Sequence, residues 1–283
     1  PKSRFFLGAS KHGHHRVHYL EWGDEKSQNI VLMVHGLNRN CHDFDMVAAA
    51  LSSTHRVIAV DVVGRGDSDY LPKEEYNYPQ YIADMNALIA RLDVDSIQWL
   101  GTSMGGLIGM FMAGMKGSPI SRLVMNDVGP FMPAATLERI KSYSSGGDEN
   151  EAEFDSLDEF ENYLRRIYEP FGLSDPHWKH LAKHGHKVTE SGKYRKKRDP
   201  HVGYPIASAP PGDLVLWFAW DMIPAQMPIM VLRGERSDLL DVPTFDQMCQ
   251  RPHTTGHVIP NVGHAPCLMT EPEIQLVRDF LQQ

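Results

Sequence analysis

The sequence predicts an α/β protein built on a mostly parallel, doubly wound sheet. Apolar runs of strand length alternate along the chain with segments whose apolar residues recur at helical spacing. Such alternation requires crossover connections, which place helices on both faces of the sheet. A long middle stretch without a buried strand, 131–213, interrupts the alternation. We therefore expect a core formed by 1–130 and 214–283, with 131–213 inserted as a helical lid.

The strands are predicted from their apolar patterns. The first, 16–22, alternates polar and apolar residues, as an edge strand with one solvated face does. Runs such as 29–35 are continuously apolar and β-branched, which suits strands buried on both faces of a sheet. The remaining predicted strands are 56–61, 96–100, 120–126, 228–234 and 254–259.

Helices are predicted between these strands and within the inserted segment. From Pro79 the apolar residues follow helical spacing, and a proline is well tolerated in the first turn. The acidic, glycine-containing stretch 145–155 predicts a solvated connector, and 187–198 predicts a polar hairpin. The other predicted helices are 43–51, 156–168, 175–184, 213–223, 244–249 and 272–281.

Composition limits the classes of partner. The 283 residues carry a net charge of −8, so no overall basic field favours nucleic acid or an anionic membrane. The three cysteines, Cys41, Cys249 and Cys267, have the spacing of neither a zinc site nor a disulfide framework. The chain shows no secretory signal and no apolar run of membrane-spanning length. We expect a cytoplasmic protein that acts on a small molecule without a cofactor, and the sequence leaves its oligomeric state open.

One motif predicts a nucleophile. A predicted strand meets a predicted helix across Gly101-Thr102-Ser103-Met104-Gly105-Gly106. This G-x-S-x-G pattern is typical of a nucleophile elbow, in which glycines make room for a strained turn that exposes the serine. We expect Ser103 to attack the substrate and the Met104 N–H to face the oxyanion that forms.

A serine nucleophile needs a base, and the base needs an orienting acid. His264 follows the last predicted strand, at the same edge of the sheet as the elbow, and is the expected base. In the order Ser…Asp…His the expected acid is Asp238, after strand 228–234, with Glu235 and Asp241 as close competitors. Asp127, after strand 120–126, is the rival from a different strand.

The loop after the first buried strand predicts the second oxyanion donor. Gly36 lets the chain turn so that the Leu37 N–H lies beside the Met104 N–H, and one such donor typically contributes ~10²–10³ in turnover. His35 in this loop is expected to be a buried, hydrogen-bonded scaffold residue. Five apolar residues flank the two junctions of the lid and are expected to floor a substrate pocket. They are Phe131, Met132, Trp217, Phe218 and Trp220.

Two further patterns are not assigned to the site. His180 and His184 are four residues apart on a predicted helix, but no carboxylate or cysteine accompanies them in the sequence, so we expect no metal. The basic run 193–198 is interpreted as the solvated face of a hairpin, with attraction of carboxylate-bearing substrates as the alternative.

Together these motifs resemble the α/β-hydrolase superfamily, in the branch that carries a lid between the sixth and seventh core strands. The resemblance implies a Ser-His-Asp hydrolase, commonly an esterase, lactonase or C–C bond hydrolase. It also implies that the loop 64–68 is a scaffold turn. Haloalkane dehalogenases and epoxide hydrolases are excluded because they have Asp where this chain has Ser103. The matching pieces are His35-Gly36, Asp61…Gly64-Arg65-Gly66-Asp67-Ser68, the elbow, Arg233-Gly234…Ser237-Asp238 and Gly263-His264.

The expected activity is cleavage of small to medium apolar carboxylic esters by a serine hydrolase, through an acyl-enzyme. The alternatives are a C–C bond hydrolase of vinylogous keto acids and a ligand-sensing receptor on the same fold.

Overall fold

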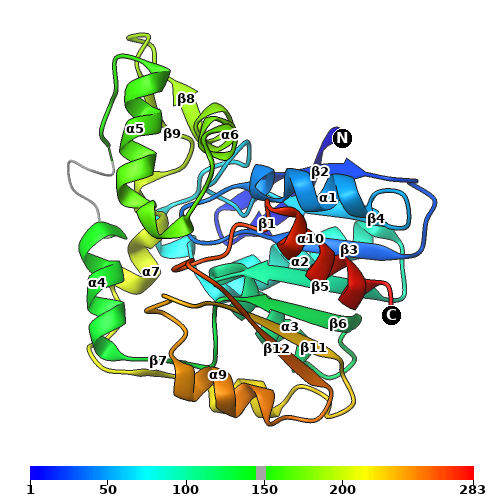
Figure 1. Ribbon diagram of the computed structural model, residues 1–283. Coiled ribbons are helices and arrows are strands. Elements are labelled where there is room, and N and C mark those ends of the chain that lie inside the picture. The colour runs from blue at the N-terminus through cyan, green and yellow to red at the C-terminus, as the bar shows by residue number, and fades with distance from the viewer. Residues whose placement is uncertain (145–150) are drawn as a thin grey trace.

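The computed structural model describes residues 1–144 and 151–283 and contains an eight-stranded sheet (Figure 1). The strand order is β1-β2-β4-β3-β5-β6-β11-β12. β1 (Lys2–Ser10) and β2 (Gly13–Trp22) form an antiparallel hairpin at one edge, and β2 pairs antiparallel with β4; the other pairs are parallel. The predicted class, a mostly parallel α/β sheet, is confirmed. The parallel strands are β3 (Ile30–Val34), β4 (Arg56–Val60), β5 (Ile97–Thr102), β6 (Ile120–Asn126), β11 (Ile229–Gly234) and β12 (Thr254–Ile259).

Strand β1 has no counterpart in the sequence-based prediction. Its side chains are mostly exposed or half-buried, and Phe6 is the one large apolar side chain of this strand that reaches the core. An edge strand of this kind carries little hydrophobic periodicity. It is held instead by backbone pairing with β2, which runs from Lys2 opposite Glu21 to Ser10 opposite Gly13.

Helices cover both faces of the sheet and bury separate apolar clusters. One cluster joins the sheet to α1 and α10, whose side chains such as Leu51 and Phe280 are buried. The cluster on the opposite face contains residues of α2, α3, α8 and α9, among them Tyr81, Leu107 and Trp220. These helices are α1 (Asp45–Leu51), α2 (Tyr78–Leu92), α3 (Met104–Ala113), α8 (Trp217–Asp221), α9 (Val242–Cys249) and α10 (Glu271–Leu281).

The segment 131–215 forms a separate layer beside one end of the sheet (Figure 1). Its two ends are joined where β7 (Phe131–Met132) pairs with β10 (Leu214–Val215). Helices α5 (Leu157–Ile167) and α6 (Asp175–Gly185) pack on each other through an apolar cluster that includes Phe160, Trp178 and Leu181. The segment also contains α4 (Ala134–Ser144), β8 (His186–Val188), β9 (Tyr194–Lys196) and α7 (Tyr204–Ala207).

Two predictions for the inserted segment have different outcomes. The predicted polar hairpin at 187–198 is present as the antiparallel pair β8–β9. The predicted connector 145–155 lies partly outside the described residues, which resume at 151. Among the helices of the described residues, none combines the length and the apolar character that crossing a bilayer requires.

Candidate active site

Ser103 lies between β5 and α3 in a strained backbone conformation, with φ 52° and ψ −117°. The turn closes only because its glycines lack side chains. A Cβ on Gly101 would lie 2.2 Å from the Gly105 carbonyl oxygen, and a Cβ on Gly105 would lie 2.0 Å from the Val34 carbonyl oxygen. A non-glycine residue in such a conformation costs roughly 1–3 kcal/mol, which the surrounding structure must offset. The predicted elbow is therefore present, with Ser103 at its tip.

Ser103 is the first member of a hydrogen-bonded chain of three side chains. Its Oγ lies 3.0 Å from His264 Nε2, and His264 Nδ1 lies 2.7 Å from Asp127 Oδ2. Because a carboxylate accepts, Nδ1–H is the donor to Asp127, and Nε2 is left to accept the serine proton. A hydroxyl, an imidazole and a carboxylate in this order can activate the hydroxyl as a nucleophile.

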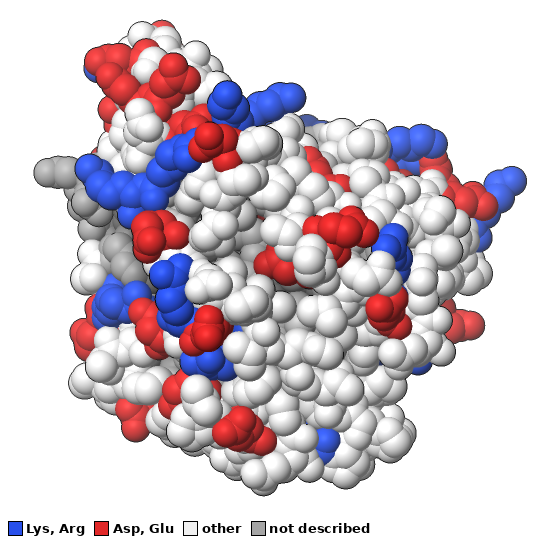
Figure 2. Space-filling view, viewed as in Figure 1, with Lys and Arg blue, Asp and Glu red and all other residues white. Residues whose placement is uncertain are grey.

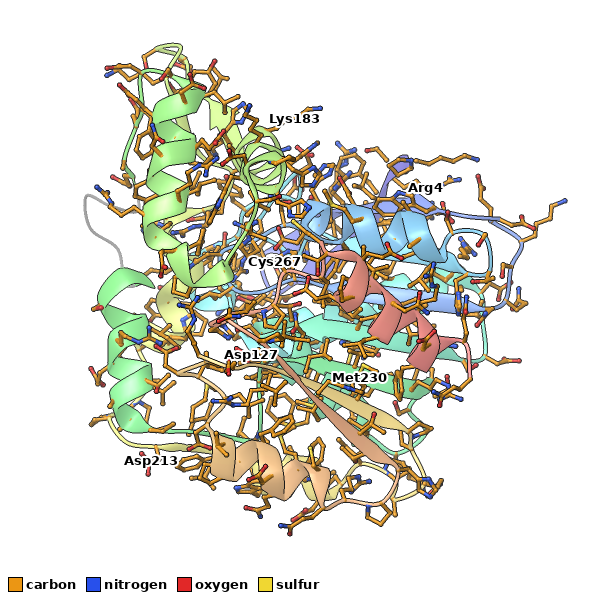
Figure 3. All side chains as sticks on the ribbon, in the orientation of Figure 1. Arg4, Asp127, Lys183, Asp213, Met230 and Cys267 are labelled. Carbon is orange, nitrogen blue, oxygen red and sulfur yellow. The ribbon has the colours of Figure 1, made fainter. Side chains whose placement is uncertain are left out.

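Asp127 is fully buried at the carboxyl end of β6, on the side of the sheet nearest the inserted segment (Figure 3). Besides the imidazole, it accepts hydrogen bonds from the Gly234 N–H at 2.9 Å and the Ser237 hydroxyl at 2.7 Å. Three donors compensate for the desolvation of a buried carboxylate, which is otherwise costly. The hydrogen bonds also fix the carboxylate, and with it the orientation of the His264 ring.

The prediction that Asp238 orients the histidine is wrong. The Asp238 side chain is 53% exposed and forms a 2.6 Å ion pair with Arg139 of α4. The rival from the neighbouring strand, Asp127, occupies the position beside the imidazole.

The shape of the loop after β11 explains this correction. The Arg233 guanidinium donates to the carbonyl oxygens of Leu240 at 2.8 Å and Ser237 at 3.2 Å, which curls the loop around it. In this loop Ser237 points inward to Asp127 and Asp238 points out. The loop therefore supplies a hydroxyl donor to the acid and not the acid itself.

The two other acids considered for this role are also engaged elsewhere. Glu235 accepts a hydrogen bond from the backbone N–H of Asn261 at 2.7 Å. Asp241 caps α9 and accepts the Thr244 N–H at 2.8 Å. Both carboxylates thus stabilise backbone turns.

The expected oxyanion donors, Leu37 and Met104, both line the cavity that contains Ser103. Gly36 brings the Leu37 loop against the nucleophile, since a Cβ on Gly36 would lie 3.5 Å from the Ser103 Cβ. Leu37 thus belongs to a loop that lies against Ser103, and Met104 directly follows Ser103, so their backbone N–H groups are the expected pair of donors.

Arg65 is a positioning residue that the sequence does not reveal, because its loop 64–68 has the pattern of a scaffold turn. Its guanidinium is fully buried and donates to the Leu37 carbonyl at 3.0 Å and to the Met104 sulfur at 3.7 Å. It also donates to Tyr81 Oη at 3.1 Å. One rigid cation thus contacts both residues whose N–H groups flank the nucleophile. The signal in the sequence is an arginine between two glycines, in the loop after a buried strand.

His35 is a scaffold residue, as the sequence indicated. Its Nδ1–H donates to the Gly36 carbonyl at 2.7 Å, and its Nε2 accepts the Val62 N–H at 3.0 Å. Burial lowers the pKa of His35 to about 4, so the ring is neutral at physiological pH. Both ring nitrogens connect the loop 35–40, which carries the expected donor Leu37 and is called the oxyanion loop below, to the loop after β4.

Above Ser103 and His264 lies a cavity of about 560 Å³, within the size range of ligand pockets. Its wall is largely apolar and includes Leu107, Val128 and Leu239 from the core together with Ile140 and Ile206 from the inserted segment. Six cationic residues also line it: Arg39, Arg139, Lys141, Lys196, Arg198 and Arg236. Figure 2 shows Lys and Arg side chains, with acidic ones among them, gathered where the inserted segment meets the core.

Of the five predicted pocket residues, one lines this cavity. Met132 lines it, but Phe131, Trp217, Phe218 and Trp220 do not appear in its wall. The Phe131 backbone pairs with β10, and Trp220 is 3% exposed in the core cluster beneath the sheet. Phe218, on the outer side of the short helix α8, is 62% exposed. The aromatic residues that do line the cavity are Tyr78, Tyr81, Tyr163, Tyr168 and Phe171.

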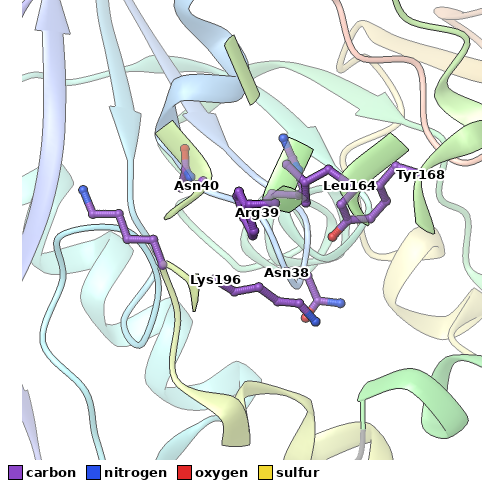
Figure 4. Close-up of a pocket in the computed structure, with 9 residues that line it drawn as sticks. Asn38, Arg39, Asn40, Leu164, Tyr168 and Lys196 are labelled. Carbon is purple, nitrogen blue, oxygen red and sulfur yellow. The ribbon is translucent and has the colours of Figure 1, made fainter. Parts of the chain in front are cut away.

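A second hollow, of about 20 Å³, lies where the oxyanion loop meets the inserted segment (Figure 4). Asn38, Arg39 and Asn40 face Leu164, Tyr168 and Lys196 across it. Its volume is close to that of one water molecule, so the larger cavity is the candidate substrate site.

Comparisons with known proteins show which family and which structures this chain is similar to. Residues 29–269 match the family described as alpha/beta hydrolase fold. A 3-hydroxybutyrate-oligomer hydrolase of Cupriavidus necator is 37% identical, over 99% of this chain and 97% of that protein. The crystal structure of a Rickettsia typhi protein superimposes with a TM-score of 0.90 at 33% identity, covering 100% of this chain and 98% of the other. An alpha/beta hydrolase from Novosphingobium aromaticivorans gives a TM-score of 0.87 at 31% identity, over 99% and 98% of the two chains.

Matched substitutions distinguish the roles of Asp127 and Asp238. Asp127→Asn should keep the fold but favour the wrong imidazole tautomer, and we expect turnover of an activated ester to fall by about 10⁴-fold. Asp238→Asn should change turnover by less than about threefold, because an exposed ion pair with Arg139 contributes little. Initial rates with p-nitrophenyl butyrate measure both. The reverse order of effects would restore Asp238 as the acid.

His35 predicts a pH dependence of stability. The unfolded chain takes up a proton near pH 6.5 and the folded one near pH 4, so the free energy of unfolding is highest above pH 6.5 and falls as the pH drops through this window. Between pH 7.5 and 5.0 this amounts to about 2 kcal/mol. Urea unfolding at the two pH values should show that His35→Gln loses that much less stability than the wild type. Equal losses in both proteins would contradict the assignment.

Proposed function

The chain belongs to the alpha/beta hydrolase fold family, and from this premise we propose that it is a serine hydrolase that cleaves carboxylic esters through an acyl-enzyme. The observation that carries the proposal is the hydrogen-bonded chain from Ser103 through His264 to Asp127, at the base of a cavity large enough for a small ester. A hydroxyl next to an oriented imidazole is the arrangement that acyl transfer requires.

In the proposed mechanism Ser103 Oγ attacks the ester carbonyl carbon while its proton passes to His264 Nε2. The N–H groups of Leu37 and Met104 hold the oxyanion, and Asp127 stabilises the imidazolium. The intermediate collapses, the ester C–O bond breaks, and the alcohol leaves with the proton from His264. Water then gives a proton to His264 and attacks the acyl-enzyme, which releases the carboxylic acid and restores Ser103.

The cavity favours a substrate with an apolar body and a carboxylate end. Its wall is mainly apolar. In the described part of the chain its lining includes six cationic residues and a single carboxylate, that of Asp238. Short oligomers of 3-hydroxybutyrate combine methyl-bearing ester units with one terminal carboxylate, and a relative 37% identical to this chain is named for hydrolysing them. We therefore narrow the expected small to medium apolar esters to oligoesters of short hydroxy acids.

The inserted segment 131–213 is proposed to act as the lid over this substrate. Residues of α4, α5 and the stretch after β9 line the cavity opposite Ser103, so they can determine which acyl and alcohol groups fit. The alternative activity, C–C bond hydrolysis of a vinylogous keto acid, draws support from the same cationic lining, since its substrate also carries a carboxylate.

A panel of four esters tests the proposal: the dimer and trimer of 3-hydroxybutyrate, each as the free acid and as its methyl ester. We expect release of 3-hydroxybutyrate from all four, with kcat/KM higher by about tenfold for the free acids at low salt and converging at high salt. Ser103→Ala should lose turnover by up to about 10⁶-fold while retaining the fold by circular dichroism.

Further measurements test the serine mechanism and the carboxylate-bearing substrate separately. Arg139→Gln with Lys141→Gln should reduce the preference for free acids without lowering turnover of p-nitrophenyl butyrate. An Ser103→Ala variant that retains substantial turnover would refute the serine mechanism. Equal kcat/KM for free acids and methyl esters would leave the mechanism intact and refute the carboxylate-bearing substrate.

A further inference from the structure

A cluster of three histidines and one aspartate joins the inserted segment to the core, away from Ser103. α6 contributes His180 and His184, which lie on one face because they are four residues apart. The core contributes His42 from the 3₁₀ helix Cys41–Phe44 and Asp45 from the start of α1. Figure 1 shows α6 close to this end of α1. Residues separated by about 140 positions thus meet at one point.

The ligand atoms of the cluster lie close together. His42 Nδ1 is 2.9 Å from Asp45 Oδ2. His180 Nε2 is 3.4 Å from the same oxygen and 2.9 Å from the His42 carbonyl oxygen, a hydrogen bond that it exchanges for the ion. One nitrogen of His184 completes a group in which the ligand atoms of His42, Asp45 and His184 all lie within 4.8 Å of one another. Tetrahedral Zn²⁺ with bonds of about 2.0 Å has ligand atoms about 3.3 Å apart, so small side-chain rotations bring this set around one ion.

Two features of the cluster point to a ligand and not only to internal hydrogen bonding. Asp45 Oδ1 is buried and has no hydrogen-bond partner, although its Oδ2 is engaged by the histidines. A buried carboxylate oxygen without a partner is costly. The imidazoles of His42 and His184 are also stacked, with centroids 3.9 Å apart, and the His180 and His184 centroids are 4.7 Å apart.

We propose that His42, Asp45, His180 and His184 bind one divalent transition-metal ion of the Zn²⁺, Co²⁺ or Ni²⁺ class. Imidazole nitrogens with one carboxylate are the donors that these ions prefer, whereas Ca²⁺ and Mg²⁺ require mostly oxygen ligands. The ion would compensate the buried Asp45 oxygen that has no hydrogen-bond partner.

The position of the site indicates what the ion does. Two ligands come from α6 and two from the core, so binding fastens the inserted segment to the sheet. The Asn40 side chain donates to the His184 carbonyl at 3.0 Å and lies three residues after Leu37. The site therefore holds α6 against the loop that carries an oxyanion donor, and it leaves the Ser103 chemistry to the side chains described above.

Metal binding is measured on the whole protein after treatment with a chelator. We expect Co²⁺ to bind with a stoichiometry of one per chain, to give visible absorption bands of a low-symmetry site, and to be displaced by Zn²⁺. We also expect each ion to raise the melting temperature in a concentration-dependent way, because it binds the folded state. Binding of Co²⁺ only at millimolar concentration, with no shift in melting temperature, would overturn the proposal and leave a hydrogen-bonded histidine network.

Substitutions assign the ligands. Asp45→Asn preserves the packing, and His180→Gln with His184→Gln removes both ligands of α6; each should weaken Co²⁺ binding by more than the ~10–100-fold typical of residues that only orient a ligand. His14→Gln, on an exposed histidine of β2, is the matched control and should leave affinity unchanged. Melting curves without metal check that each variant folds. Equal Co²⁺ affinity in a folded Asp45→Asn variant and in the wild type would also overturn the proposal.

Discussion

The site depends on one buried carboxylate, Asp127. It accepts hydrogen bonds from the His264 imidazole N–H, the Ser237 hydroxyl and the Gly234 backbone N–H, all of which follow β6 in the chain. A buried carboxylate is stable only when hydrogen-bond donors surround it. Burial of Asp127 therefore requires that β11, the loop after β11 and the His264 loop are all in their native positions. The same hydrogen bonds that make burial possible also orient the base toward Ser103.

On the other side of Ser103, buried side chains fix the loop that carries Leu37. Arg65 and His35 are both fully buried, and both end on the backbone of the loop 36–37. Arg65 in addition contacts the Met104 side chain and the carbonyl of Val202 in the inserted segment. The oxyanion loop is therefore fixed from the sheet, from the helix after Ser103 and from the inserted segment together, which limits its movement when charge develops.

The sequence predicts those site residues that follow from a motif or from their position after a strand. Ser103 follows from glycines that a tight strand–helix turn demands, and His264 from its position after the last strand. The prediction that Asp238 orients His264 is wrong because the choice between two strand-end carboxylates depends on the shape of the loop around Arg233. Residue spacing does not determine that shape. The prediction of an aromatic pocket floor is wrong for Trp220 and Phe218 because α8 directs Trp220 into the core and leaves Phe218 exposed. No metal is expected from His180 and His184 because no carboxylate lies near them in the sequence. In the structure Asp45, 135 positions before His180, lies beside them, a contact that spacing cannot predict.

The His264–Asp127 hydrogen bond can be observed directly by proton NMR. The Nδ1–H of His264 should give a resonance far downfield, assigned by its loss in His264→Gln, since His15 and His18 also contact carboxylates. The structure predicts that this resonance disappears in Asp127→Asn and remains in Asp238→Asn. Its persistence in Asp127→Asn, or its loss in Asp238→Asn, would contradict the account.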